Sequence, residues 1–422
     1  MNIQSLLHNS SLKRGTLFTI FSFANNGISF LLLIILANYI TPNEYGQLNL
    51  FNILISLLSI FISLSTIGYI PVSFFKKTQK EFRQVINTVL FTSTSTLVLI
   101  SFILLIFNQS VEKWVGISTQ YQFIALLICY MQLYTSINLE IWRIEEKTIA
   151  YGFYSLSSVI LNFGLSLLLI IIFHQGWLGR VYAQMLVVSI FFILSIIIMI
   201  KRGYLTIKIP EKKIIIDTLK FGIPLIPHNI SFWFRQGLDR NIINYFFTAT
   251  EVGIFSFAMN FANIISIVGN AFNATNSVFI YKQLSNNNEK VQITLRKQEH
   301  LMFLFFLGLS IVTFITVSLF IPIFLPKYKD AIYLLPPLCL SAFFQCIYLL
   351  YVNYLFFYKK TRLLMYITFS LSFIQGILSL CLTRYGMIWT AYISLFISIC
   401  TTFFVYICSR KIINKSNSEI KL

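Results

Sequence analysis

The sequence predicts an all-α membrane protein that crosses the bilayer twelve times. Of its 422 residues, 57% are hydrophobic and only 11% are charged, whereas a soluble domain carries about 25% charged residues. Apolar stretches of about 20 residues, long enough to cross the hydrocarbon core, also recur along the whole chain. Each stretch is expected to be a helix, because a helix satisfies its own backbone hydrogen bonds in lipid.

Six spans are expected in each half of the chain. In the first half they run near residues 16–40, 47–70, 85–107, 121–139, 149–173 and 178–200. In the second half they run near residues 217–246, 251–280, 301–324, 331–357, 363–382 and 387–408. The first stretch is too long for the core of a signal peptide, and no small-residue cleavage site follows it, so we expect it to be a helix.

The positive charges test this count. Of the 32 Lys and Arg residues, 25 fall in loops on the side of the N-terminus, 5 fall in loops on the opposite side, and Arg235 and Arg240 lie inside the seventh span. Because Lys and Arg concentrate in cytoplasmic loops, both termini are predicted to be cytoplasmic. The net charge of +18 is then an orientation signal that faces anionic lipid, and no nucleic-acid partner is predicted.

The two halves of the chain resemble each other. The matching segments are 41–46 with 248–253, 147–148 with 360–361, and Gly176 and Tyr182 with Gly386 and Tyr392, at offsets of 207, 213 and 210 residues. Six helices per half give both halves the same orientation, so we predict two parallel six-helix repeats. They form a lobe at 1–200 and a lobe at 217–422, joined by a cytoplasmic linker at 201–216. Transporters with parallel repeats bind substrate near the bilayer midplane and alternate access between the two sides.

The seventh span holds an unusual number of polar groups. A charge at the bilayer centre costs roughly 2.5–3.5 kcal/mol, yet this span carries His228, Asn229, Arg235, Gln236, Asp239 and Arg240. Pro224 and Pro227 precede all of them and predict a kink. Arg235 and Asp239 are four residues apart and could neutralise each other as a buried pair. Two arginines against one aspartate nevertheless leave a positive surplus, which favours a cavity for an anion.

Polar side chains also follow one side of the first, second and eighth spans. The candidates for lining a cavity are Asn25, Asn26, Asn52, Ser56, Ser59, Asn263 and Asn270, together with Gln236. Small polar residues are also how membrane helices pack against one another. Their occurrence on the first two spans of each half favours a shared water-filled cavity.

No catalytic or cofactor-binding constellation is found. The sequence has no P-loop, so it predicts no ATPase. Its six cysteines lack CxxC spacing, which predicts free thiols and no metal site. We therefore expect a transporter rather than an enzyme.

Three segments carry a resemblance to a known family. Residues 37–46 read ANYITPNEYG, residues 221–228 read FGIPLIPH and are followed by Trp233 and by Asp239-Arg240, and residues 251–256 read EVGIFS, with a weaker match from Tyr328 to Pro337. On these segments the chain resembles the polysaccharide repeat-unit flippases of the Wzx type. These belong to the superfamily that includes the MATE exporters and the lipid II flippases. The likeness extends over nearly the whole chain.

The resemblance implies a MATE-like two-lobed fold with a cationic cavity built from helices 1, 2, 7 and 8. It implies transport of undecaprenyl-diphosphate-linked oligosaccharide repeat units, for O-antigen or another surface polysaccharide, across a bacterial inner membrane, driven by an ion gradient. The diphosphate is expected near Arg235 and Arg240, with Arg14 at the cytoplasmic mouth. Asp239 or His228 is expected to carry the coupling ion, a proton or sodium. Expected partners are membrane lipid, a polysaccharide polymerase and a chain-length regulator.

Two other functions stay open. A multidrug or cation antiporter of the same fold would require an acidic cavity, whereas the charge surplus in the seventh span is positive. A membrane-embedded polysaccharide polymerase or acyltransferase would require catalytic residues on a sizeable outer loop or a His/Asp pair on one face, and the sequence offers neither.

Overall fold

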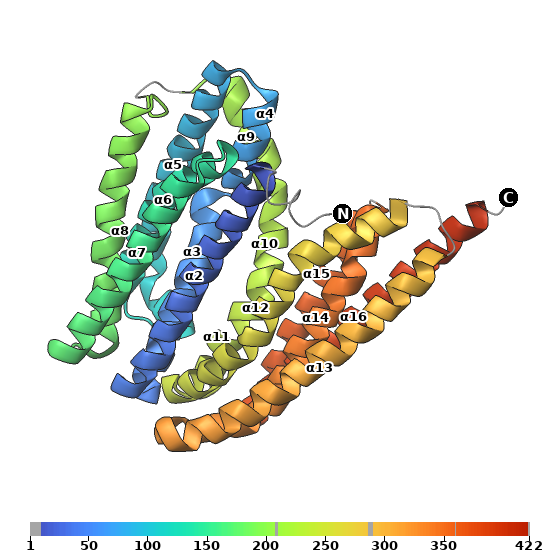
Figure 1. Ribbon diagram of the computed structural model, residues 1–422. Helices are drawn as coiled ribbons and strands as arrows, with labels where there is room; N and C mark the ends of the chain where they lie inside the picture. The colour runs from blue at the N-terminus through green and yellow to red at the C-terminus, as the bar shows by residue number, and fades with distance from the viewer. Residues whose placement is uncertain (1–9, 207–209, 286–289, 359, 421–422) are drawn as a thin grey trace. The chain divides into compact units, whose positions relative to one another are not determined.

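The computed structural model describes residues 10–206, 210–285, 290–358 and 360–420. In these ranges the chain forms helices joined by short turns, and none of the described residues is in a β-strand (Figure 1). The all-α fold class predicted from the sequence is therefore confirmed.

The chain divides into two compact units, and each is described here by itself. Unit 1 comprises residues Met1–Ile230 and unit 2 comprises Ser231–Leu422. Unit 1 contains α2 (Ser10–Tyr39), α3 (Pro42–Ser63), η1 (Thr66–Gly68), α4 (Tyr69–Lys76), α5 (Gln79–Val115), α6 (Thr119–Ile144), α7 (Thr148–Leu167), η2 (Leu168–Ile172), α8 (Gly176–Lys201), α9 (Lys212–Gly222) and η3 (Ile223–Leu225). The division falls inside α10 (Ile226–Trp233). Unit 2 contains η4 (Phe234–Leu238), α11 (Asp239–Phe246), α12 (Ala249–Ser285), α13 (Lys290–Phe324), η5 (Pro326–Leu334), α14 (Leu335–Phe357), α15 (Thr361–Leu382), η6 (Thr383–Tyr385) and α16 (Met387–Ile420).

Eleven helices in the described ranges are long and apolar enough to cross a membrane. They correspond to eleven of the twelve predicted spans, and the protein is a multi-pass membrane protein. The remaining span, the seventh, is interrupted. The break that Pro224 predicts is present as the 3-10 turn η3, and a π-helical turn, η4, follows α10. A twelfth crossing, cytoplasmic termini and a division into lobes at residues 201–216 stay predictions.

Three helix pairings recur at equivalent places in both units. In unit 1 the first span packs on the fifth (α2 on α7), the second on the fourth (α3 on α6), and the fourth on the sixth (α6 on α8). In unit 2 the seventh packs on the eleventh (η4 on α15), the eighth on the tenth (α12 on α14), and the tenth on the twelfth (α14 on α16). This shared pattern is what duplication of a six-helix unit predicts.

A shared capping device explains the motif at 41–46. Glu44 N–H donates to Thr41 Oγ1 (3.2 Å), and Thr41 N–H donates to Glu44 Oε2 (2.8 Å), which forms a capping box at the start of α3. At an offset of 207 residues, Thr248 N–H donates to Glu251 Oε2 (3.1 Å) at the start of α12. The repeated motif therefore caps the start of the second span of each half, α3 and α12, in the same way.

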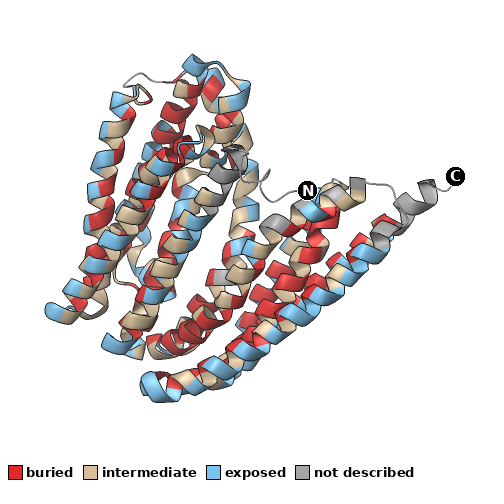
Figure 2. Cartoon of the chain, in the orientation of Figure 1, coloured by how far each residue is buried: buried red, intermediate tan, exposed pale blue. Residues whose placement is uncertain are grey.

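Burial follows one side of the peripheral helices. Along α13, Val317 and Ile321 are buried, whereas Leu319 and Ile323 are 64% and 72% exposed. Figure 2 shows the buried and exposed bands that alternate along α13 and α8. Large apolar side chains exposed in such numbers suit a lipid environment and not water.

A charged cluster ties together the ends of α6 and α8. Glu145 accepts hydrogen bonds from Arg202 and from the Tyr204 hydroxyl (2.5 Å), and pairs with Lys147 (3.0 Å). Burial alone would raise the pKa of Glu145, but the hydrogen bonds from Tyr204, Lys147 and Arg202 outweigh it and lower that pKa below its ordinary value.

Close packing also holds α9 in unit 1. A Cβ added at Gly222 would lie 2.4 Å from the carbonyl oxygen of Leu64, a residue in the left-handed conformation with φ of 45°. Only glycine allows this approach. At Gly27 of α2, by contrast, an added Cβ would meet nothing within 4 Å.

Candidate functional site: a polar cavity in unit 2

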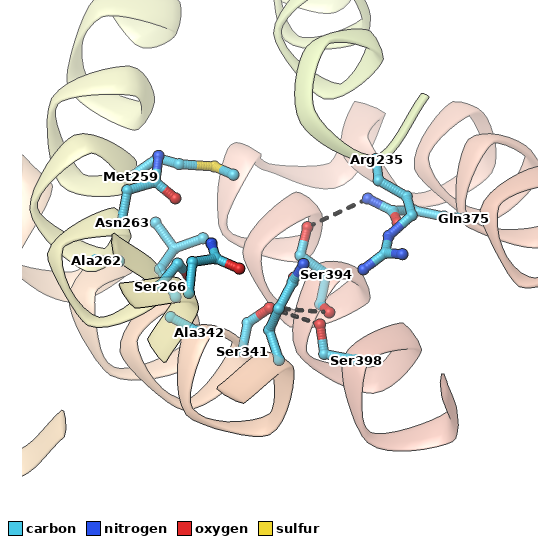
Figure 3. Close-up of a pocket in the computed structure, with 13 residues that line it drawn as sticks. Arg235, Met259, Ala262, Asn263, Ser266, Ser341, Ala342, Gln375, Ser394 and Ser398 are labelled. Carbon is cyan, nitrogen blue, oxygen red and sulfur yellow. Dashed lines mark hydrogen bonds between the residues drawn. The ribbon is translucent and has the colours of Figure 1, made fainter. Parts of the chain in front are cut away.

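Unit 2 contains a polar cavity of about 100 Å³ between α12, α14, α15, α16 and the π-helical turn η4 (Figure 3). Its polar lining consists of Arg235, Asn263, Ser266, Asn270, Ser341, Gln345, Gln375, Ser394 and Ser398. Its apolar lining consists of Met259, Ala262, Leu338 and Ala342. These residues include no Asp or Glu, so the cavity combines one cation with neutral hydrogen-bonding groups.

Among the described residues that line the cavity, Arg235 alone is charged. It is half-buried, and Figure 3 shows its guanidinium pointing into the cavity, on the side where Ser394 and Ser398 lie. Among the described residues Arg235 forms no hydrogen bond and has no carboxylate within 4.0 Å. A guanidinium presents five N–H donors in a planar fork that matches phosphate and carboxylate. Arg235 is therefore free to bind an anion.

Asp239 does not neutralise Arg235. Its side chain is buried, and both carboxylate oxygens are bound by α15 and α16. Oδ1 accepts from Ser379 Oγ (3.0 Å), while Oδ2 accepts from Gln375 Nε2 (3.0 Å) and Ser394 Oγ (3.1 Å). The ion pair that the spacing of four residues allowed is absent from the described residues.

Two residues connect the cavity to this carboxylate. Gln375 and Ser394 both line the cavity and both donate to Asp239. A change in the charge or occupancy of Asp239 must alter the hydrogen bonds of these two side chains, and so alter the wall that Arg235 faces. Arg235 lies on the π-helical turn η4, and Asp239 begins α11.

Comparison with known proteins supports the family predicted from the sequence. The family described as "Polysaccharide biosynthesis protein" matches residues 11–279, and the MatE family matches residues 224–382. The chain belongs to the polysaccharide biosynthesis protein family.

Relatives in one bacterium cover most of the chain. The chain is 25% identical to an uncharacterized membrane protein of Haemophilus influenzae, over 84% of this chain and 85% of that protein. It is 24% identical to the Lsg locus putative protein 1 of Haemophilus influenzae, over 80% of this chain and 82% of that protein.

Solved structures share the fold. An inward-facing multidrug resistance MATE family transporter of the MOP superfamily superposes with a TM-score of 0.74 at 14% identity, over 93% of this chain and 96% of that one. The lipid II flippase MurJ, in an inward closed conformation, superposes with a TM-score of 0.73 at 15% identity, over 94% of this chain and 87% of that one. The MATE-like fold is therefore confirmed, and at such identity the likeness shows the fold alone.

The structure brings three of the predicted site residues together in unit 2. Arg235, Asn263 and Asn270 all line the cavity. Arg240 is buried instead, and its Nε donates to Ser256 Oγ (2.8 Å) on α12. The side chain of Gln236 lies outside the described part of the structure.

The predicted residues of unit 1 lie on helices with different principal neighbours, α7 for α2 and α6 for α3. Asn25 is half-buried, Asn26 is exposed, and Asn52 is half-buried. Ser56 and Ser59 are exposed, and their hydroxyls donate to carbonyls of their own helix, at 2.7 and 2.8 Å. His228 is exposed, and the side chain of Arg14 lies outside the described part. The roles of these residues stay predictions.

Sequence reasoning missed the residues that α14, α15 and α16 contribute. They are Ser341 and Gln345, Gln375 and Ser379, and Ser394 and Ser398. The signal was present, because Gln345 and Gln375 are polar amides within apolar spans, and such groups mark interior positions of a membrane bundle. Within the described ranges, no group of three or more His, Cys, Asp or Glu residues could hold a metal ion.

Proposed function

We propose that this protein is a flippase that carries undecaprenyl-diphosphate-linked oligosaccharide repeat units across a bacterial inner membrane by ion-coupled alternating access. The observation that carries the proposal is the cation of Arg235. It faces a cavity whose other described polar residues are neutral, and no carboxylate of the described residues lies within 4.0 Å of it. A diphosphate is the part of such a substrate that an arginine fork binds, and the contact is strengthened where water is excluded. Arg240 and Arg14 stay candidates for further contacts to the phosphates.

The neutral groups of the cavity suit the remainder of the substrate. Serine hydroxyls and the amides of Asn263, Asn270 and Gln345 both donate and accept hydrogen bonds, as sugar hydroxyls do. The polyprenyl tail would stay in the surrounding lipid.

Ion coupling is proposed to act through Asp239. A buried carboxylate is costly unless it is protonated or accompanied by a cation. Binding of a proton or sodium ion to Asp239 would change the hydrogen bonds that this carboxylate accepts from Gln375 and Ser394. These two residues also line the Arg235 cavity. Those two residues give a direct physical route between the ion and the substrate.

A multidrug or cation antiporter is the second candidate, favoured by the MatE match and by the MATE-like fold. A cationic drug in this cavity would face Arg235 with no acidic residue in the lining to offset the repulsion. The charge of the cavity therefore favours the anionic substrate.

Complementation tests the proposal against this second candidate. A strain that lacks its own repeat-unit flippase is given the wild-type gene, Arg235→Gln or Arg384→Gln, a control on an exposed arginine of the same unit. We expect wild type and Arg384→Gln to restore surface glycan, and Arg235→Gln to restore little at equal membrane protein. If the strain that receives the wild-type gene becomes resistant to cationic drugs but displays no surface glycan, the proposal is overturned.

A further inference from the structure

Unit 1 also contains a charged side chain on a membrane-spanning helix, that of Arg180. Arg180, one of the five charges that the sequence count placed in loops opposite the N-terminus, lies instead on α8. Its Nη1 donates to Asn162 Oδ1 and to Ser166 Oγ (3.0 Å) on α7. No carboxylate lies within 4.0 Å of Arg180 among the described residues. The partners of this guanidinium are therefore one amide and one hydroxyl, separated by one turn of the same helix.

The same pair of side-chain types recurs in unit 2 at the repeat offset. The segments 147–148 and 360–361, at which α7 and α15 begin, are 213 residues apart. The same offset relates Asn162 to Gln375 and Ser166 to Ser379. Gln375 and Ser379 are two of the three groups that bind Asp239. We call these two pairs of side chains the amide–hydroxyl seats of unit 1 and unit 2.

The two seats bind side chains of opposite charge, and these side chains belong to different spans of their repeats. In unit 2 the charge is the carboxylate of Asp239, from the seventh span. At the offset of 207 residues the corresponding position of the first span is Leu32, which is apolar and 3% exposed. In unit 1 the charge comes instead from Arg180, on the sixth span.

Amides and hydroxyls can serve either charge, because each can both donate and accept. In unit 2 the amide N–H of Gln375 and the hydroxyl of Ser379 donate to a carboxylate. In unit 1 the carbonyl oxygen of Asn162 and the oxygen of Ser166 accept from a guanidinium. A seat that presents oxygens to a fixed cation has no room or charge for a mobile one, whereas a seat that holds a carboxylate attracts one.

We propose that Arg180 is a built-in cation that permanently fills the seat of unit 1, so that unit 1 binds no exchangeable cation. The coupling cation then binds in unit 2 alone, at Asp239. This inference rests on the proposed function for the coupling role of Asp239. The two repeats then differ in function. In unit 1 the seat is occupied by the side chain of Arg180, and only unit 2 binds the cation whose gradient drives transport.

Cation binding to the purified full-length protein tests the inference. The probe is the cation that drives wild-type transport. Sodium is measured as bound 22Na⁺ per chain by equilibrium dialysis, and protons are measured as uptake per chain relative to the double variant Asp239→Asn/Asn162→Leu. We expect wild type to bind one cation and Asp239→Asn to bind none. A cation still bound by Asp239→Asn, and lost when Asn162→Leu is added, would overturn the inference and leave the flippase proposal intact. A wild-type protein that binds no cation and ignores ion gradients would instead contradict the coupling in the proposed function.

A gain-of-function series supplies the complementary test. In the Asp239→Asn background, Leu32→Asp combined with Arg180→Gln rebuilds in unit 1 the carboxylate arrangement of unit 2 and should restore binding of one cation per chain. Leu32→Asp alone should restore none, because Arg180 neutralises the new carboxylate internally. Equal binding by the two variants would overturn the inference, and so would a folded, monodisperse double variant that binds nothing.

Discussion

Replacing Asp239 separates a coupling role for this carboxylate from a purely structural one. Its oxygens accept three hydrogen bonds, from Ser379 (3.0 Å), Gln375 (3.0 Å) and Ser394 (3.1 Å). In Asp239→Asn, the amide oxygen keeps the two acceptor positions of Oδ2, and the amide N–H₂ donates to Ser379, whose hydroxyl can accept. Hydrogen bonds to a charged group contribute about 1.5–3 kcal/mol and neutral ones about 0.5–1.5 kcal/mol. Removing a buried charge offsets part of this loss, so the net cost to folding is about 0–2 kcal/mol.

Asp239→Ala should behave differently. It leaves the buried hydroxyls of Ser379 and Ser394 without this acceptor, and leaves Gln375 Nε2 with only its 3.5 Å contact to Ser394 Oγ. At about 1–3 kcal/mol for each donor left unsatisfied, the substitution costs at least about 2 kcal/mol. We expect the alanine variant to accumulate poorly in the membrane.

Protein level, thermal midpoint and gradient-driven transport are measured for both variants, with Asp330→Asn, on an exposed carboxylate of the same unit, as the control. We expect Asp239→Asn to accumulate near the wild-type level but to lose gradient-driven transport, while Asp330→Asn keeps both. Full gradient-driven transport by Asp239→Asn would refute the coupling role. Loss of folded protein in Asp239→Asn as severe as in Asp239→Ala would show that the hydrogen-bond reasoning is wrong.

Three further predictions address topology, the charged cluster and the packing of α9. A reporter fused after Leu422 should report the cytoplasm, and one inserted at 327–330 should report the periplasm; a periplasmic C-terminus would contradict the twelve-helix topology. Because the pKa of Glu145 is lower in the folded protein, its stabilisation is present above the unfolded pKa of about 4.3 and is lost as the pH falls through the lower folded value. Glu145→Gln should therefore lower the thermal midpoint at neutral pH and reduce the fall of that midpoint as the pH is lowered. Parallel plots of thermal midpoint against pH for the wild type and the variant would contradict a stabilising role for the Glu145 carboxylate. Gly222→Ala forces a new Cβ to within 2.4 Å of a backbone oxygen and should cost about 1–3 kcal/mol, while Gly27→Ala should be close to neutral; equal thermal midpoints for these two variants would contradict the packing.

Most of the fold could be predicted from the sequence, because the bilayer imposes a length and an apolar composition on every span. Eleven predicted spans appear as helices long and apolar enough to cross. The prolines of the seventh span correctly predicted its first interruption. The π-helical turn η4, which carries Arg235, has no comparable signal, because one extra residue in a turn does not change the composition.

The site could be predicted only in part. Arg235 and Asn263 stood out as polar groups within apolar spans, and both line the cavity. The partners of Asp239 could not be found from local spacing, because Gln375 and Ser394 lie 136 and 155 residues further along the chain. Helical periodicity shows which side of a helix is polar, but not which helix that side meets.

The serine stripe of the second span illustrates the same limit. Periodicity marked Ser56 and Ser59 as a polar side, but their hydroxyls bond to carbonyls of α3 itself. A hydroxyl satisfied by its own backbone is compatible with lipid, with helix packing or with a cavity. The stripe therefore carries less information about function than an amide or a charge in the same place.

Transport in proteoliposomes tests the central claim most directly. The purified protein is reconstituted with a labelled undecaprenyl-diphosphate oligosaccharide, and transfer between leaflets is followed by a membrane-impermeant glycosidase under an imposed proton or sodium gradient. We predict transfer that stops when the gradient is dissipated, that does not require ATP, and that falls at least about tenfold in Arg235→Gln, since a charged hydrogen bond to phosphate contributes about 1.5–3 kcal/mol. Gradient-driven movement of a cationic dye, with the lipid-linked glycan left in its original leaflet, would contradict the account.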